Sequence, residues 1–117
     1  MIAVTNRLRT RKGEGNHLKQ RFAKPKRVHH MPGFVSLELM TSTQSEEYDE
    51  YVVRTVWQDR ESFEGWVNSQ QFKEGHARRE KADDSIIEFK VTIYDIVHHH
   101  LPAESEESVA AATGEQS

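Results

Sequence analysis

An α+β fold is predicted for this chain by the order of its sequence patterns and by its length. Segments that alternate as strands and segments with helical spacing follow one another as strand, helix, strand, strand, helices, strand. This order is typical of the ferredoxin-like, split βαβ arrangement with an antiparallel sheet. The 117 residues suffice for one modest hydrophobic core and are too few for two. We therefore expect one domain of this fold.

The first two strands are each expected to bury one face. Residues 2–10 alternate, with Ile2, Val4 and Leu8 on one side and arginines on the other. Residues 35–39 alternate in the same way after a Pro-Gly turn.

The last two strands have apolar residues on both faces. They cover residues 51–57 and 86–97, and in the second of them Ile86 and Phe89 are expected on opposite faces. Strands buried on both faces need a cover on each side. The helices supply one cover, and no remaining segment supplies the other. A second copy of the sheet would supply it, so we expect a homodimer.

The first helix is expected after a turn at residues 12–15. Leu18 and Phe22 form its apolar stripe. Pro25 lacks an N–H group and should kink or end this helix.

The second helical region, residues 61–79, is predicted to form two short helices broken at residues 68–69. Trp66 lies in the first of them, and Phe72 and His76 lie four apart in the second. Residues three or four apart share a helical face, so His76 is expected beside an aromatic anchor that faces inward. Such a histidine is either a core residue or a ligand, and the pattern alone leaves both readings open.

The end of the chain differs from the rest in composition. Residues 102–117 contain four Glu and no Lys, Arg or aromatic residue. Such a segment cannot bury enough apolar area to offset its ordering entropy. We therefore expect a domain at residues 1–101, nearly neutral with 16 basic and 15 acidic residues, and a disordered acidic tail.

The sequence contains no cysteine, which excludes disulfides, thiolate zinc sites and cysteine-held iron–sulfur clusters. No apolar run approaches the roughly 20 residues of a membrane span, and no signal-peptide pattern begins the chain. We expect a cytoplasmic protein without a membrane partner.

The first 30 residues hold nine Lys or Arg against one acidic residue. A basic block of this kind suggests nucleic acid or an anionic ligand. Interleaved aromatics and nucleic-acid motifs are missing, and the domain is nearly neutral. We therefore interpret the block as a solvated face with one or two anion contacts, and expect no nucleic-acid partner.

Asn6 interrupts the apolar face of the first strand. An amide there must find hydrogen-bond partners or cost about 1–3 kcal/mol. It is either satisfied by neighbouring backbone or a pocket residue with a free amide. By contrast, the histidine runs His29–His30 and His98–His100 lack carboxylates at a telling spacing, and we interpret both as solvated.

Several motifs together resemble the IsdG-type haem-degrading monooxygenases of the antibiotic biosynthesis monooxygenase (ABM) superfamily. They are NRLRTRKG from Asn6, RF at Arg21 and Phe22, PGF at 32–34, TVW at 55–57, and Trp66, Phe72 and His76. The resemblance covers about residues 2–97. It implies a dimeric ferredoxin-like α+β barrel.

The resemblance also implies roles for individual residues. His76 would be the axial ligand of haem iron, Asn6 would donate its amide near the iron-bound oxygen, and Trp66 would press on the porphyrin and buckle it. Phe22 would form a pocket wall. Arg21 is either the partner of a haem propionate or an exposed helical arginine.

The function implied is oxygen-dependent cleavage of haem to an open tetrapyrrole with release of iron. Haem is then substrate and cofactor at once, and electrons come from an external reductase, because the chain has no flavin or nicotinamide motif. Two alternatives stay open. One is a haem carrier or sensor without turnover, and the other is a cofactor-independent ABM-type monooxygenase acting on a small aromatic or quinol.

Overall fold

The computed structural model describes residues 1–24, 27–74 and 85–103. Its elements are, in order, β1 (Ile2–Arg11), α1 (Asn16–Arg21), the 3-10 helix η1 (Val28–His30), β2 (Phe34–Ser42), β3 (Tyr48–Trp57), α2 (Arg60–Val67) and β4 (Ile86–Asp95). After α2 the chain turns at residues 68–69 and is helical again at 70–74. The predicted order of strands and helices and the break between the two short helices are confirmed.

The four strands form one antiparallel sheet in the order β2-β3-β1-β4. The two strands from the chain's middle and start, β3 and β1, are therefore central, and β2 and β4 are edges. Asn6 lies in the middle of the sheet, opposite Val53 on β3 and Val91 on β4. Residues paired in this way point to the same face of the sheet.

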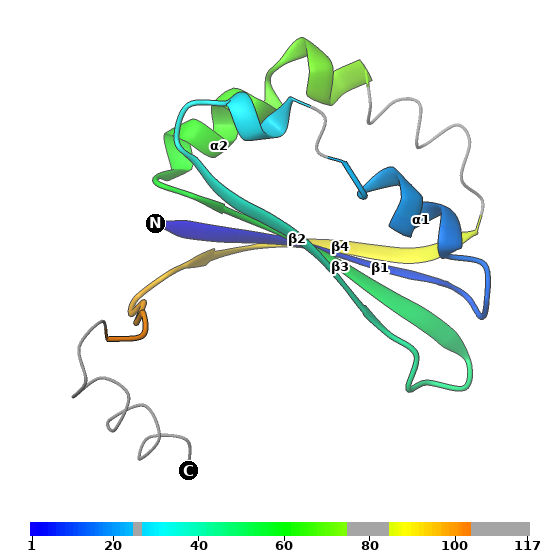
Figure 1. Ribbon diagram of the computed structural model, residues 1–117. Coiled ribbons are helices and arrows are strands. Elements are labelled where there is room, and N and C mark those ends of the chain that lie inside the picture. The colour runs from blue at the N-terminus through cyan, green and yellow to red at the C-terminus, as the bar shows by residue number, and fades with distance from the viewer. Residues whose placement is uncertain (25–26, 75–84, 104–117) are drawn as a thin grey trace.

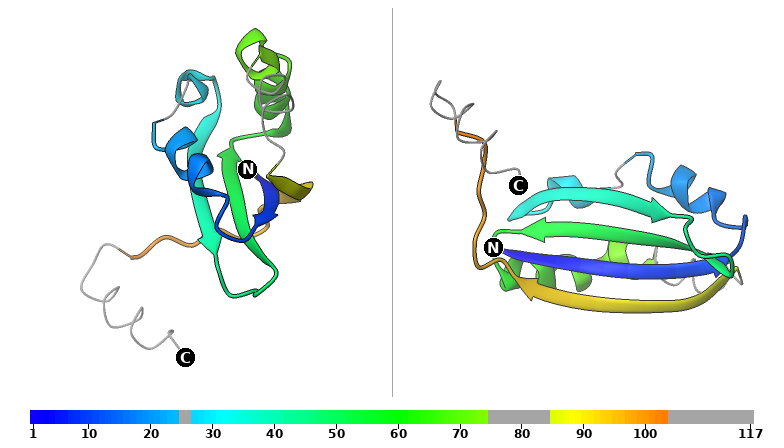
Figure 2. Two further views of the ribbon diagram at one scale, coloured as in Figure 1. Left: turned by 90° about the vertical axis from the view of Figure 1, so that its right-hand side faces the viewer. Right: turned by 90° about the horizontal axis from the view of Figure 1, so that it is seen from below.

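The helices lie on one face of the sheet, with α2 over one end and α1 over the other (Figure 1). The view from below shows the four strands from their opposite face, with the helices behind them (Figure 2). The fold is thus a two-layer α+β arrangement, as predicted.

The core between these layers consists of two clusters of buried side chains. The first comprises Ile2, Val4, Val28 and Trp57. The second comprises Leu8, Leu18 and Tyr51. Each cluster lies under one helical end of the sheet, since Phe63 and Trp66 of α2 pack on the first and Leu18 of α1 belongs to the second.

The first helix is shorter than the sequence suggested. It ends at Arg21, and Phe22 caps it, with the Phe22 N–H donating to the Leu18 carbonyl at 3.1 Å. Pro25 lies outside the described residues, so its predicted effect stays a prediction.

The start of α2 is fixed by a side-chain cap. Asp59 accepts hydrogen bonds from both the backbone N–H and the hydroxyl of Ser62, each at 2.7 Å. The hydroxyl and then the N–H lower the pKa of Asp59, because both stabilise the charged carboxylate. This cap fixes where the helix that carries Trp66 begins.

Strand β4 contains an irregularity that the sequence did not reveal. Glu88 is opposite Arg9 but Ile86 is opposite Thr10, so Ile87 is an extra residue. The bulge turns Ile86 to the helical face, where it packs on the cluster that contains Leu8. The prediction that Ile86 and Phe89 point to opposite faces was therefore wrong.

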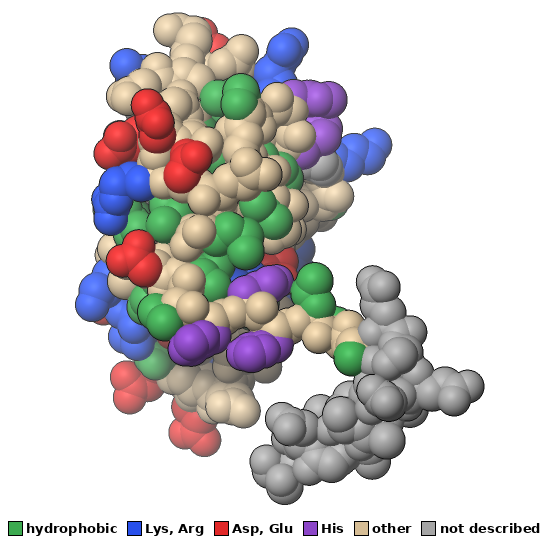
Figure 3. All heavy atoms as spheres, turned by 90° about the vertical axis from the view of Figure 1, so that its left-hand side faces the viewer, with side chains coloured by type: hydrophobic (Ala, Val, Ile, Leu, Met, Phe, Trp, Pro, Cys, Tyr) green, Lys and Arg blue, Asp and Glu red, His purple; other side chains and the backbone are tan. Residues whose placement is uncertain are grey.

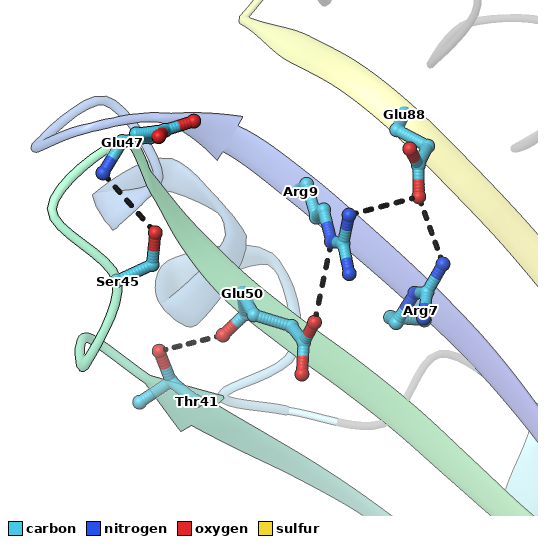
Figure 4. A network of polar contacts seen from close by, with 7 residues as sticks. All are labelled: Arg7, Arg9, Thr41, Ser45, Glu47, Glu50 and Glu88. Carbon is cyan, nitrogen blue, oxygen red and sulfur yellow. Dashed lines mark hydrogen bonds and ion pairs between the residues drawn. The ribbon is translucent and has the colours of Figure 1, made fainter.

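The face of the sheet without helices carries a network of charges (Figure 4). Glu88 on β4 accepts a hydrogen bond from Arg7 at 2.8 Å and lies 3.4 Å from Arg9. Arg9 also reaches Glu50 on β3 at 3.4 Å, and its guanidinium lies 4.4 Å from the centre of the Tyr48 ring. The expectation that Arg7 and Arg9 lie on the face opposite the core is confirmed.

Two further expectations, on membrane spans and on the acidic tail, can be compared with the structure only within the described residues. No helix among them is long and apolar enough to cross a membrane. The acidic tail falls almost wholly at 104–117, outside the described residues, and the boundary at residue 101 stays a prediction.

Candidate functional site

The candidate site is built around Asn6, at the middle of the helix-covered face of β1. Its strand neighbours on this face belong to different clusters, Val4 to the first and Leu8 to the second. The amide thus interrupts the core between α1 and α2. Its Oδ1 is buried, yet it has no hydrogen-bond partner among the residues that the structure describes. A buried polar atom left in this state costs about 1–3 kcal/mol, so a bound ligand that paired with it would recover a specific gain.

The residues that flank Asn6 across the sheet are apolar. Val53 and Val91 are its partners in the register, and Phe89 follows on the same face opposite Leu8. Val91 and Phe89 are 52% and 61% exposed, although they lie on the side of the sheet that holds the core. This part of the helix-covered face therefore combines a buried amide oxygen that lacks a partner in the described ranges with apolar side chains open to contact.

Sequence reasoning did not single out these flanking residues as site candidates. In the sequence they are ordinary members of a two-sided apolar strand. Their position beside Asn6 depends on the pairing register of β1 with β3 and β4, which an alternating pattern does not specify.

Trp66 approaches the same face of the sheet from α2. Its half-buried side chain packs on the cluster that contains Val4 and Trp57. It also meets Phe72 edge to face, with ring centroids 5.6 Å apart and planes at 80°. Gly65, the preceding residue, is exposed, and no described atom outside its chain neighbours and its own helix backbone lies within 4 Å of the position that a β-carbon would take. The indole is therefore anchored on one side while the helix surface beside it stays open.

Arg21 and Phe22 lie at the end of α1, over the other part of the same sheet face. Both side chains are half-buried. A half-buried phenylalanine here is compatible with the predicted pocket wall. The position of Arg21 is compatible with both interpretations, partner of a propionate and surface residue of the helix.

His76 lies outside the described residues, as do all positions from 75 to 84. The helical segment that would lead to it is described as far as Glu74. The structure thus places Asn6, Arg21, Phe22 and Trp66 on elements of one sheet face, whereas the predicted position of His76 stays a prediction.

The other histidines do not form a site among the described residues. His98 and His100 are exposed, with ring centroids 6.1 Å apart, and His29 and His30 are exposed with centroids 4.0 Å apart. Figure 3 shows histidines in two separate places on the surface. Within the described ranges, no three His, Cys, Asp or Glu side chains are grouped to hold a metal ion.

The turn that precedes α1 is held by a buried carboxylate. Asp49 accepts the Gly13 N–H at 2.9 Å and lies 2.9 Å from the Lys12 ammonium. These interactions, the Gly13 N–H first, lower the pKa of Asp49. Lys12 also donates to the carbonyls of Thr43 and Ser45, so one lysine ties the start of α1 to the connection between β2 and β3.

Comparison with known proteins gives a consistent result. A model of the family described as antibiotic biosynthesis monooxygenase matches residues 1–78. A protein from Bacillus thuringiensis subsp. konkukian (strain 97-27), named heme-degrading monooxygenase, is 37% identical over 102 residues, covering 87% of this chain and 95% of its own length.

Solved structures agree on the fold. A Bacillus cereus protein described as an antibiotic biosynthesis monooxygenase has a TM-score of 0.71 at 19% identity, covering 86% of this chain and 96% of its own. The heme degrader MhuD from Mycobacterium tuberculosis, with two hemes bound in its active site, has a TM-score of 0.62 at 25% identity, covering 86% and 99%.

Proposed function

The chain belongs to the antibiotic biosynthesis monooxygenase family, and from this premise we propose that it is a haem-degrading monooxygenase. It binds haem on the helix-covered face of its sheet and cleaves the porphyrin to an open tetrapyrrole with release of iron. The reaction consumes O₂ and electrons from an external reductase.

The observation that carries this proposal is a polar amide, that of Asn6, set among apolar side chains, with an Oδ1 that is buried and has no partner in the described part of the chain. A flat apolar ligand with a polar centre fits such a surface, because the ring covers the valines and the phenylalanine while the amide reaches the centre. The 37% identity to a protein named heme-degrading monooxygenase, over 87% of this chain, supports the same ligand.

The roles of the individual residues follow from this ligand. His76 would hold the iron through its imidazole, and the amide nitrogen of Asn6 would donate a hydrogen bond toward the oxygen substrate. Trp66 would press its indole against the macrocycle and distort it. Phe22 forms a wall, and Arg21 pairs with a propionate. Haem supplies the iron at which oxygen is activated, and the side chains orient it and exclude water.

The same proposal includes a homodimer formed through the sheet face without helices. That face has exposed apolar residues, with Met40 at 44% and Tyr94 at 53%. It also holds both signs of charge, as in the contacts of Glu88 with Arg7 and Arg9. A second copy of the sheet would cover the apolar residues and present complementary charges. The cytoplasmic location expected for the cysteine-free sequence stays a prediction.

Haemin titration followed by reduction in air tests the function. We expect the Soret band to sharpen and saturate stoichiometrically. After addition of ascorbate with catalase present, it should then decay. His76→Ala should lose the complex or its turnover, whereas His98→Ala, an exposed histidine beyond β4, should behave as the wild type.

The other outcomes separate the alternatives. A stable Soret band under ascorbate and oxygen would replace the enzyme with a carrier or sensor. Failure to bind haem would refute the haem proposal and would favour a cofactor-independent monooxygenase that acts on a small aromatic or quinol substrate.

A further inference from the structure

Ser69 occupies the junction between α2 and the helical segment that starts at Gln70. Its hydroxyl donates to the Trp66 carbonyl at 2.6 Å and accepts the Phe72 N–H at 3.2 Å. Its backbone N–H donates to the same Trp66 carbonyl at 3.0 Å, and its carbonyl accepts the Lys73 N–H at 3.2 Å. Ser69 therefore satisfies backbone groups at the end of one helix and at the start of the next.

The two residues joined by this hydroxyl are also the two whose rings meet. Trp66 and Phe72 are six positions apart, which on one straight helix would place them about 120° apart around the axis, on different faces. Their edge-to-face contact at 5.6 Å exists because the chain bends at residues 68–69. The hydroxyl that bridges the bend thus sets the geometry of the aromatic pair.

We propose that Ser69 is a positioning residue for Trp66. Its hydroxyl fixes the bend, the bend seats Phe72 against the indole, and Phe72 holds the indole plane that faces the macrocycle. The inference rests on the proposed function, since it is the haem-facing role of Trp66 that Ser69 serves. Small errors in such a group are costly, because a misplacement of about 1 Å can reduce a rate on the order of a hundredfold.

Three substitutions separate the two hydrogen bonds. Ser69→Ala removes both, and Ser69→Thr keeps both. Ser69→Asp keeps an acceptor for the Phe72 N–H and loses the donor to the Trp66 carbonyl. Each variant is titrated with haemin, and the rate of Soret decay under ascorbate and air is measured beside far-UV circular dichroism and thermal unfolding.

We expect Ser69→Thr to keep the wild-type rate of Soret decay. Ser69→Ala should still bind haem stoichiometrically, but its rate of Soret decay should fall about tenfold or more. The rate of Soret decay should fall as much in Ser69→Asp as in Ser69→Ala, because the side-chain hydrogen bond to the Trp66 carbonyl is lost in both. Ser69→Asp also serves where Ser69→Ala folds poorly, since it retains the helix cap. Resonance Raman bands that report distortion of haem should shift in Ser69→Ala and in Ser69→Asp toward those of Trp66→Phe.

A double-mutant cycle gives the decisive comparison. In a Trp66→Phe background, Ser69→Ala should cause little further loss. An equal loss in both backgrounds, or a Ser69→Ala variant as active as the wild type, would overturn the positioning role. Wild-type protein that fails to degrade haem would instead refute the proposed function, so the two failures are distinguishable.

Discussion

Gly33 and Ser62 lie in direct contact, so that the turn before β2 rests on the first turn of α2. A β-carbon on Gly33 would overlap the Ser62 hydroxyl and β-carbon. Gly33 also has φ +78°, a left-handed conformation that other residues adopt at a cost. This contact joins the capped start of the helix that carries Trp66 to the edge of the sheet.

Gly33→Ala should therefore lower the free energy of unfolding by about 2–3 kcal/mol, through backbone strain and overlap together. Gly13→Ala is the matched control, because Gly13 has φ +79° but, apart from its chain neighbours, no described atom lies within 4 Å of its would-be β-carbon. It should lose only the strain contribution, about 1 kcal/mol. Urea unfolding of both variants measures the difference. Equal losses would show that the contact with Ser62 contributes nothing.

Asn6→Leu should separate stability from activity. Removing a buried oxygen that has no partner among the described residues should raise the free energy of unfolding of the ligand-free protein by about 1 kcal/mol, or leave it unchanged. The rate of haem decay should fall on the order of a hundredfold, as when a hydrogen-bonding group at a reacting centre is removed. Denaturant unfolding and the Soret decay measure the two effects.

The control for this substitution is Gln44→Leu, an exposed amide between β2 and β3. It should change the free energy of unfolding by no more than a few tenths of a kcal/mol and should leave the rate of haem decay as in the wild type. An Asn6→Leu variant that degrades haem at the wild-type rate would remove Asn6 from the site.

Acid should weaken the turn that holds α1. The folded-state pKa of Asp49 is below its ordinary value of 3.8, chiefly through the Gly13 N–H and then Lys12. The stabilisation is therefore fully present above 3.8 and is lost as the pH falls through the lower, folded-state pKa. The melting temperature of Asp49→Asn should be lower than that of the wild type at neutral pH, and should fall less steeply with acid.

Asp95→Asn, at the exposed end of β4, is the matched control for this measurement. Its melting temperature should follow the wild-type acid profile. If Asp49→Asn also followed that profile, the turn would not depend on the charge of Asp49.

Glu88→Gln should weaken the proposed dimer. Glu88 contacts Arg7 and Arg9 on the face without helices, and in a single chain such partly exposed pairs contribute at most about 1 kcal/mol. Covering this face with a second sheet would reduce screening, and the dimer dissociation constant of Glu88→Gln should then rise about tenfold. Sedimentation equilibrium at low and high salt measures this change.

Glu14→Gln removes a carboxylate from an exposed ion pair with Arg11 at 3.2 Å and serves as the comparison. It should leave the association state as in the wild type. Equal effects of the two substitutions would argue that the network of Glu88 is not part of an interface between copies.

The fold was predictable because its signals are local. Alternation in residues 2–10 and helical spacing around Leu18 and Trp66 each need only a few neighbouring residues. The bulge at Ile87 was not predictable, because it adds one residue to a strand that is apolar on both faces, so neither register violates the pattern. The helix η1 was likewise missed, since three residues are too few to show a period.

The site was predictable in part, for a related reason. Asn6 stood out because an amide breaks an apolar face, and that needs no knowledge of the rest of the chain. The apolar neighbours Val53 and Val91 depend on long-range pairing, and the hydroxyl of Ser69 gains its meaning only from the bend that it bridges. His76 stays a prediction from spacing and family resemblance.

Strand β4 has a consequence for how the protein behaves in solution. It is an edge of the sheet and carries exposed Ile87, Phe89 and Val91, a combination that invites strands of other molecules to add to it and form aggregates. Two features oppose this addition. The bulge at Ile87, in the pairing with β1, bends the strand, and the charges of Glu88 and Lys90 alternate with the apolar side chains. The resistance of the protein to aggregation at high concentration should therefore depend on these two charges more than on the burial of its hydrophobic core.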